Sequence, residues 1–264
     1  MRVVVLVGAG ASFGAFDNPD LKPPLGDFLY PRLVAEYSET WGHFPEDVAA
    51  VFDADGFELG MAALREEAIH TQAALIDMGS FFATFCLRSG VNRYLALAKA
   101  LEFCGPSIEY TFGSLNYETY LEQTFWRMGW GVHYWGMPHP DNHGRHVRII
   151  KPHGSCNFIV DTGTNRFEGT RIIGGGVYIG GTGLKVVDLD DVVGAAITGF
   201  PSAMSLYAPG KPDLVCPEFV QGLRAGWTAA IDGADAIAII GARPMFESDP
   251  HVWGTPRVSV GQLA

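Results

Sequence analysis

Short apolar runs alternate along this chain with longer segments whose apolar residues recur at helical spacing. The clearest run is 3–7, where four of five residues are Val, as in a strand buried on both faces. Similar runs at 108–112, 147–150 and 236–240 predict further strands. Helical spacing over 217–231, and within the segment from 46 to 104, predicts the helices between them.

Strands that alternate with helices predict an α/β fold, here a Rossmann-like parallel sheet with helices on both faces. We expect one domain over 1–264, with a helical insertion after the first βα unit at approximately 46–105. Short β runs between Gly clusters predict a small β-rich excursion at approximately 156–200. Gly113 is expected to end the second strand, and the Gly-, Pro-, Trp- and His-rich segment 129–145 is expected to be a loop or an irregular excursion.

The first strand leads directly into a glycine-rich turn formed by Gly8, Ala9, Gly10, Ala11 and Ser12. Glycine has no Cβ, so the backbone can turn sharply and bring several N–H groups against an anion. A helix that opens near Ser12 would add its dipole. The spacing to Gly14 is one residue longer than the dehydrogenase fingerprint, which disfavours a nicotinamide dehydrogenase. An ordinary tight βα turn is the alternative to a nucleotide site.

Four predicted strands each end in a polar or Gly-containing turn. These turns are 8–12, 113–118, 153–155 and 241–249. In open parallel sheets, ligands gather outside the carboxyl ends of the strands. The sequence therefore predicts one ligand site to which all four turns contribute.

Composition limits the classes of partner. The formal net charge of −11 gives no electrostatic footprint for nucleic acid or for an anionic membrane. No apolar run is long enough for a transmembrane helix or a signal peptide, which favours a cytoplasmic protein. The four cysteines contain no CxxC pair, so we expect reduced thiols and no metal site.

Several motifs together resemble those of the sirtuin-like (SIR2-like) domains and occur in the same order. They are GAGAS at 8–12, Asn-Tyr-Glu at 116–118, Lys-Pro-His-Gly-Ser at 151–155, and Ile-Ile-Gly-Ala-Arg-Pro at 239–244, followed by Asp249 and His251. The chain is most similar to the bacterial branch found in anti-phage defence effectors.

The resemblance implies a domain that binds NAD⁺ as its substrate and cleaves it to nicotinamide and ADP-ribose, without a metal. It assigns the catalytic roles to Asn116, beside the nicotinamide ribose, and to His153, as a base toward a ribose hydroxyl. It assigns binding of NAD⁺ to Gly8, Ala9, Gly10, Ala11, Ser12, Glu118, Ser155, Gly241, Arg243 and Asp249. Taken alone, Asn116 could be a turn residue and His153 a structural histidine.

Three departures from the family pattern matter. Glu118 stands where relatives usually have Asp. The four-cysteine zinc module of the protein deacylases is missing, which disfavours lysine deacylation. The chain ends soon after Asp249 and His251, where relatives usually continue, so we expect sensing to reside in a partner or in a missing segment. As partners we expect a homo-oligomer or a separate sensor protein. The alternatives are a non-catalytic module that senses NAD or ADP-ribose, and an enzyme that transfers ADP-ribose to an acceptor or deacylates one.

Overall fold

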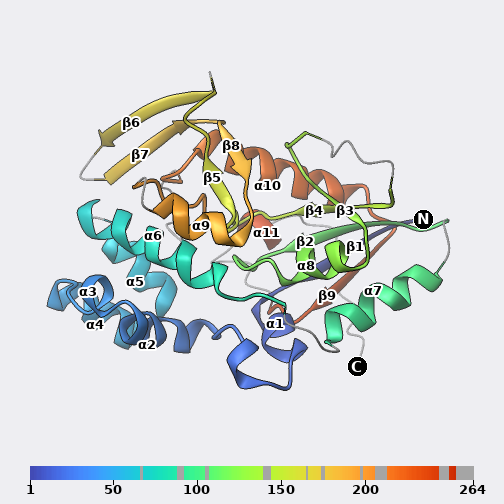
Figure 1. Ribbon diagram of the computed structural model, residues 1–264, viewed down its shortest axis with the longest axis horizontal. Helices are drawn as coiled ribbons and strands as arrows, with labels where there is room; N and C mark the ends of the chain where they lie inside the picture. Colours follow the sequence, from blue (N-terminus) through green and yellow to red (C-terminus); the bar gives the residue numbers. More distant parts are fainter. Residues whose placement is uncertain are drawn as a thin grey trace.

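A five-stranded parallel sheet forms the centre of the molecule, with the strand order β3-β4-β2-β1-β9 (Figure 1). The computed structural model describes residues 1–65, 68–87, 92–104, 107–138, 144–164, 166–173, 176–196, 199–205, 213–243 and 250–253. The strands of the sheet are Arg2–Val7 (β1), Glu109–Ser114 (β2), Gly131–Tyr134 (β3), His146–Ile150 (β4) and Ala236–Ile240 (β9). The predicted Rossmann-like α/β fold is confirmed.

Helices occupy most of the chain between β1 and β2, as the sequence predicts for an insertion after the first βα unit. Figure 1 shows α2–α6 gathered as a lobe beside the sheet, while α7 lies apart from that lobe. The helices of this half are Ala9–Ala15 (α1), the 3₁₀ turn Pro19–Leu21 (η1), Gly26–Glu36 (α2), Ser38–Trp41 (α3), Glu46–Asp55 (α4), Phe57–Leu64 (α5), Ala68–Ala83 (α6) and Arg93–Phe103 (α7).

The second half of the chain adds two small antiparallel pairs, β5 with β8 and β6 with β7. The β-rich excursion also contains a helix, α9, which packs against α6. The elements of this half outside the central sheet are Tyr120–Arg127 (α8), Phe158–Val160 (β5), Phe167–Ile173 (β6), Gly176–Gly181 (β7), Leu184–Val186 (β8), Leu189–Ala196 (α9), Pro217–Asp232 (α10) and Pro250–Trp253 (α11).

The sheet is covered on both faces. Alternate side chains of β1 enter two different cores, because successive residues of a strand point to opposite faces. Val5 and Val7 belong to the large core shared with α7 and α8, whereas Val4 and Leu6 pack with Trp227 of α10. This two-sided burial confirms what the apolar run at 3–7 predicts.

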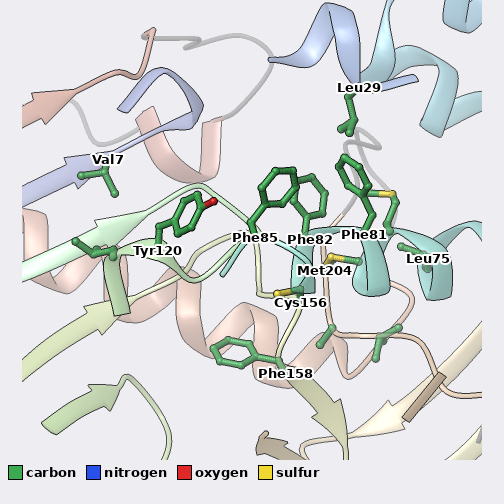
Figure 2. Close-up of a cluster of buried hydrophobic side chains, with 14 of the residues drawn as sticks. Val7, Leu29, Leu75, Phe81, Phe82, Phe85, Tyr120, Cys156, Phe158 and Met204 are labelled. Atoms are coloured by element: carbon green, nitrogen blue, oxygen red, sulfur yellow. The ribbon is translucent and has the colours of Figure 1, made fainter. Parts of the chain in front are cut away.

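Aromatic side chains connect the helical insertion to the sheet. Figure 2 shows Phe81 and Phe82 at the end of α6 between Leu29 of α2 and Tyr120 of α8. Phe85, just after α6, has its ring centroid 6.2 Å from that of Tyr120. The insertion and the central sheet therefore share one large core.

Two expectations about the elements are wrong. Gly113 does not end β2; the strand continues through it to Ser114, and a Cβ at Gly113 would lie 2.2 Å from Cζ3 of Trp227. Close packing of α10 therefore explains this glycine. The segment 129–145 is not all loop either, because 131–134 forms β3 and pairs with β4. Glycines with positive φ at 129 and 136 flank this short strand, and residues 139–143 lie outside the described ones.

Candidate functional site

The carboxyl ends of the strands meet at one edge of the sheet, as the sequence predicts. Val7 of β1 lies opposite Ser114 of β2 and Ile240 of β9, and Gly113 lies opposite Ile150 of β4. The turns after these four strands are therefore neighbours. In the sheet, β2 lies on one side of β1, and the chain returns much later to place β9 on the other side of β1. This is the topological arrangement at which open α/β sheets bind ligands.

The glycine-rich turn packs directly against the turn after β9. The amide of Gly8 donates to the carbonyl of Ile240 at 3.0 Å, and the amide of Gly10 donates to that of Gly241 at 2.9 Å. Gly241 has φ +61°, and a Cβ there would lie 1.9 Å from the amide nitrogen of Ala11. The glycines are therefore needed for the approach of two backbones, whether or not an anion binds.

Helix α1 begins earlier than expected. It starts at Ala9, with Gly8 as N-cap, rather than near Ser12, because the βα turn consists of Gly8 alone. Ala9 and Gly10 are exposed at this helix start, and the first turn has no acidic residue. The amides of Gly8, Gly10 and Ala11 already donate to protein carbonyls, so what the exposed start of α1 offers to an anionic group of a ligand is the amide of Ala9.

A buried polar cluster surrounds the hydroxyl of Ser12. Ser12 Oγ lies 2.5 Å from Glu118 Oε1 and 2.8 Å from Asn116 Nδ2. Its third neighbour is the hydroxyl of Tyr94 in α7, also at 2.8 Å. All four side chains are buried. The structure thus brings three predicted residues together and adds one, Tyr94, that the sequence analysis missed.

The amide of Asn116 has a defined orientation in this cluster. Its Nδ2 donates to the carbonyl of Gly8 at 3.2 Å and to Ser12 Oγ at 2.8 Å. The opposite orientation would set Oδ1 against the carbonyl oxygen of Gly8, where two acceptors would face each other. The hydrogen bonds of Nδ2 to Gly8 and Ser12 therefore fix the orientation of the amide. Among the hydrogen bonds of the described residues, both amide hydrogens are used, and Oδ1 is the atom left to accept from a ligand hydroxyl or a water.

The carboxyl of Glu118 is held by two helices. Its Oε1 accepts from Ser12 of α1, and its Oε2 accepts from the backbone amide of Tyr120 at the start of α8, at 2.6 Å. Burial raises the pKa of the Glu118 carboxyl, while Lys151 and the hydrogen bond from Ser12 oppose that shift. The longer side chain of Glu, in place of Asp, thus reaches inward to Ser12.

A fully buried lysine connects this cluster to the next turn. Lys151 follows β4, and its Nζ donates to the carbonyl oxygen of Glu118 at 2.7 Å and to Glu122 Oε1 at 2.9 Å. Both side chains of the ion pair are 0% exposed. Lys151 therefore fixes the 116–118 turn relative to the end of β4.

The turn that contains His153 is bonded to the same 116–118 turn. The backbone amide of Cys156 donates to the carbonyl of Tyr117 at 2.9 Å, and the buried Ser155 hydroxyl donates to the same oxygen at 3.3 Å. His153 is half-buried, and its carbonyl accepts from the amide of Ser205 at 2.8 Å. Asn116 and His153 thus lie on adjacent, hydrogen-bonded turns.

The remaining predicted residues lie at or beyond the β9 side. Gly241 contacts the glycine-rich turn directly, and Arg243 is exposed two residues further on. Asp249 lies outside the described residues.

Three buried residues that hold the turns of the site in place were absent from the predicted set: Tyr94, Glu122 and Lys151. Lys151 has a signal in the sequence, since it is a charged residue directly after a buried strand. Tyr94 has none, because its partner Ser12 is 82 positions away.

Other features of the described residues do not overlap this cluster. A small cavity between α6 and β7, lined by residues that include Thr71, Gln72 and Ile179, contains none of the candidate residues. Within the described ranges, no cluster of three or more His, Cys, Asp and Glu side chains could hold a metal ion. No helix in that part of the chain has the length and apolar character needed to cross a membrane.

These observations define the class as a Rossmann-like α/β protein with a buried polar cluster at the carboxyl edge of its sheet. Neither a protein-family model nor a curated protein matches the chain significantly.

Proposed function

We propose that this protein is an NAD⁺ glycohydrolase, which cleaves NAD⁺ to nicotinamide and ADP-ribose. The observation that supports it most directly is the cluster of Ser12, Asn116 and Glu118, bonded to the turn of His153 at the edge where ligands bind. The order of these residues resembles that of the sirtuin-like domains, with Glu118 in place of the usual Asp, and the sheet topology agrees with an NAD-binding fold.

The chemistry fits these residue types. Cleavage breaks the bond between the nicotinamide nitrogen and the ribose carbon, which develops oxocarbenium character, and a water then adds to that carbon and loses a proton. In the proposal, Asn116 Oδ1 accepts a hydrogen bond from the ribose or the attacking water and so orients it. His153 is the proposed base and takes the proton. The exposed start of α1 receives the pyrophosphate.

The proposal includes regulation. An enzyme that depletes NAD⁺ must be held in check, so we propose a cytoplasmic effector, of the kind that acts in anti-phage defence, switched by homo-oligomer assembly or by a separate sensor protein. A constant, full activity of the isolated monomer would contradict this part of the proposal alone.

The experiment measures nicotinamide release from NAD⁺ by the purified chain and by the variants Asn116→Ala and His153→Ala. The matched control is His43→Ala, which removes an exposed histidine between α3 and α4. We expect release by the native chain and the control, and loss of release in both site variants at unchanged melting temperature.

Two other outcomes identify the alternatives. Thermal stabilisation by NAD⁺ with no nicotinamide release would indicate a non-catalytic binding module. Release that requires an added acceptor would indicate ADP-ribosyl transfer or deacylation.

A further inference from the structure

Tyr94 belongs to the helical insertion and yet reaches the centre of the candidate site. It lies in the first turn of α7, and its buried hydroxyl is 2.8 Å from Ser12 Oγ. The start of α7 is well fixed, because Asn92 caps it by accepting from the amide of Leu95 at 2.8 Å. Arg93 also donates to the carbonyl of Gly14 in α1. The position of Tyr94 is therefore determined by two contacts outside the cluster.

The donors and acceptors around Ser12 allow a single complete arrangement when Glu118 is ionised. A serine hydroxyl has one proton and two lone pairs. Asn116 Nδ2 can only donate to it, and the carboxylate of Glu118 can only accept from it. Ser12 therefore gives its proton to Glu118 and uses one lone pair for Asn116. The second lone pair is filled by the proton of Tyr94.

The protonation of Tyr94 agrees with this arrangement. Burial and the nearby charge of Glu118 raise the pKa of the Tyr94 phenol well above its usual value. Tyr94 therefore keeps its proton and remains a donor.

We propose that Tyr94 is a positioning residue of this site, which acts through Ser12 to fix the amide of Asn116. The catalytic part of this inference rests on the proposed function. The structural part, that Tyr94 orients the Asn116 amide through Ser12, does not. Without the tyrosine proton, Ser12 Oγ keeps Glu118 and Asn116 but loses the third of its three partners, so the oxygen that receives the Asn116 amide is held less firmly. The oxygen that the proposed reaction uses, Asn116 Oδ1, is then less well oriented.

The first test compares Tyr94→Phe with Tyr134→Phe. Both remove one hydroxyl from an equally buried tyrosine, since Tyr94 and Tyr134 are each 4% exposed. Tyr134 lies on β3, and its hydroxyl donates to Glu122 Oε1 at 3.4 Å, so the control removes a buried hydroxyl that contacts Glu122 instead of Ser12. We expect Tyr94→Phe to lower kcat for NAD⁺ cleavage at least about tenfold with little change in KM, because the lost orientation matters most in the transition state. Turnover equal to that of Tyr134→Phe would overturn the inference.

A double-mutant cycle tests whether Tyr94 acts through Ser12. Tyr94→Phe is combined with Ser12→Ala, and kcat is measured for each single variant and for the pair. A positioning role through Ser12 predicts that Tyr94→Phe has almost no further effect once Ser12 is alanine. Full additivity of the two effects would contradict it.

A readout that is independent of activity separates this inference from the proposed function. The side-chain amide protons of Asn116 are followed by ¹⁵N NMR and are assigned by their loss in Asn116→Asp. We expect Tyr94→Phe to shift these signals and to speed their exchange with water, and Tyr134→Phe to leave them unchanged. If the native chain releases no nicotinamide, the proposed function fails and the NMR result alone decides the role of Tyr94. Unchanged Asn116 signals in Tyr94→Phe would overturn that role.

Discussion

At the residue scale, the most unusual feature is a set of three charged side chains buried beneath the carboxyl edge of the sheet. Glu118, Glu122 and Lys151 are all buried. The ammonium of Lys151 donates to the carboxylate of Glu122 and to the backbone carbonyl of Glu118. Removing one member of a buried ion pair leaves an uncompensated charge, whereas replacing both members with apolar residues can be nearly neutral. Loss of one member of the Lys151–Glu122 pair should therefore cost much more stability than replacement of both members.

The variant Lys151→Met should lower the free energy of unfolding by about 3–5 kcal/mol, because it leaves Glu122 buried without its cation. The double variant Lys151→Met, Glu122→Leu should recover most of that loss. Urea denaturation of the three proteins measures both effects. A single variant that loses less than about 1 kcal/mol would show that the pair is not buried as described.

Glu118 should make stability depend on pH. Its folded pKa is raised, mainly by burial, above the ordinary value of 4.5. Between 4.5 and the folded pKa, the folded state holds a proton that the unfolded state has lost. The contribution of the carboxyl to stability is therefore full below 4.5 and is lost as the pH rises through the folded pKa.

The measurement compares native protein with Glu118→Gln from about pH 4 to about pH 8 by denaturant unfolding. Relative to the variant, the native chain should become less stable as the pH rises. A stability difference that does not change with pH would contradict the raised pKa.

Residues of the candidate site could be predicted only where they follow a strand. Asn116, Glu118 and His153 stand in the turns after β2 and β4, so the predicted sheet already places them at one edge. The inward orientation of Glu118 could not be predicted, because it depends on Ser12 and on the start of α8. The contribution of Tyr94 depends on where the insertion folds back, which no local pattern records.

At the scale of elements, two turns fit together so closely that their glycines cannot be replaced. The turn after β1 donates two backbone hydrogen bonds, to Ile240 at the end of β9 and to Gly241 just after it. Gly241 also combines a positive φ with a neighbouring backbone atom in the way of any Cβ. Gly129 provides a comparison, since it has φ +75° but no atom within 4 Å of the position of a Cβ.

Gly241→Ala should therefore cost more than about 3 kcal/mol of stability, the sum of backbone strain and a clash with Ala11. Gly129→Ala should cost about 1 kcal/mol, from the positive φ alone. Thermal and urea unfolding of both variants check the difference. Equal losses would mean that the two turns are not packed as described.

The elements themselves were largely predictable, because long apolar runs and helical spacing fix their type. β3 was missed because a four-residue edge strand flanked by glycines looks like a loop, and its strand character comes from pairing with β4. The continuation of β2 through Gly113 cannot be predicted locally. The glycine is required by the ring of Trp227, which lies more than a hundred residues further along the chain.

At the scale of the whole molecule, the net charge of −11 bears on the proposed regulation. Like-charged copies repel, and salt screens that repulsion. If assembly switches the enzyme, nicotinamide release per chain should rise with protein concentration and also with moderate salt. Sedimentation and activity measured over one concentration series test this, and a specific activity that stays constant while the chain remains monomeric would contradict it.

The central claim, that this chain hydrolyses NAD⁺ with Asn116 in the site, is tested most directly by one measurement. Nicotinamide and ADP-ribose are quantified after incubation of NAD⁺ with the native chain and with Asn116→Ala, both at high protein concentration. The account predicts equal amounts of the two products from the native chain and a loss of at least about a hundredfold in the variant. Equal turnover by both proteins would contradict it.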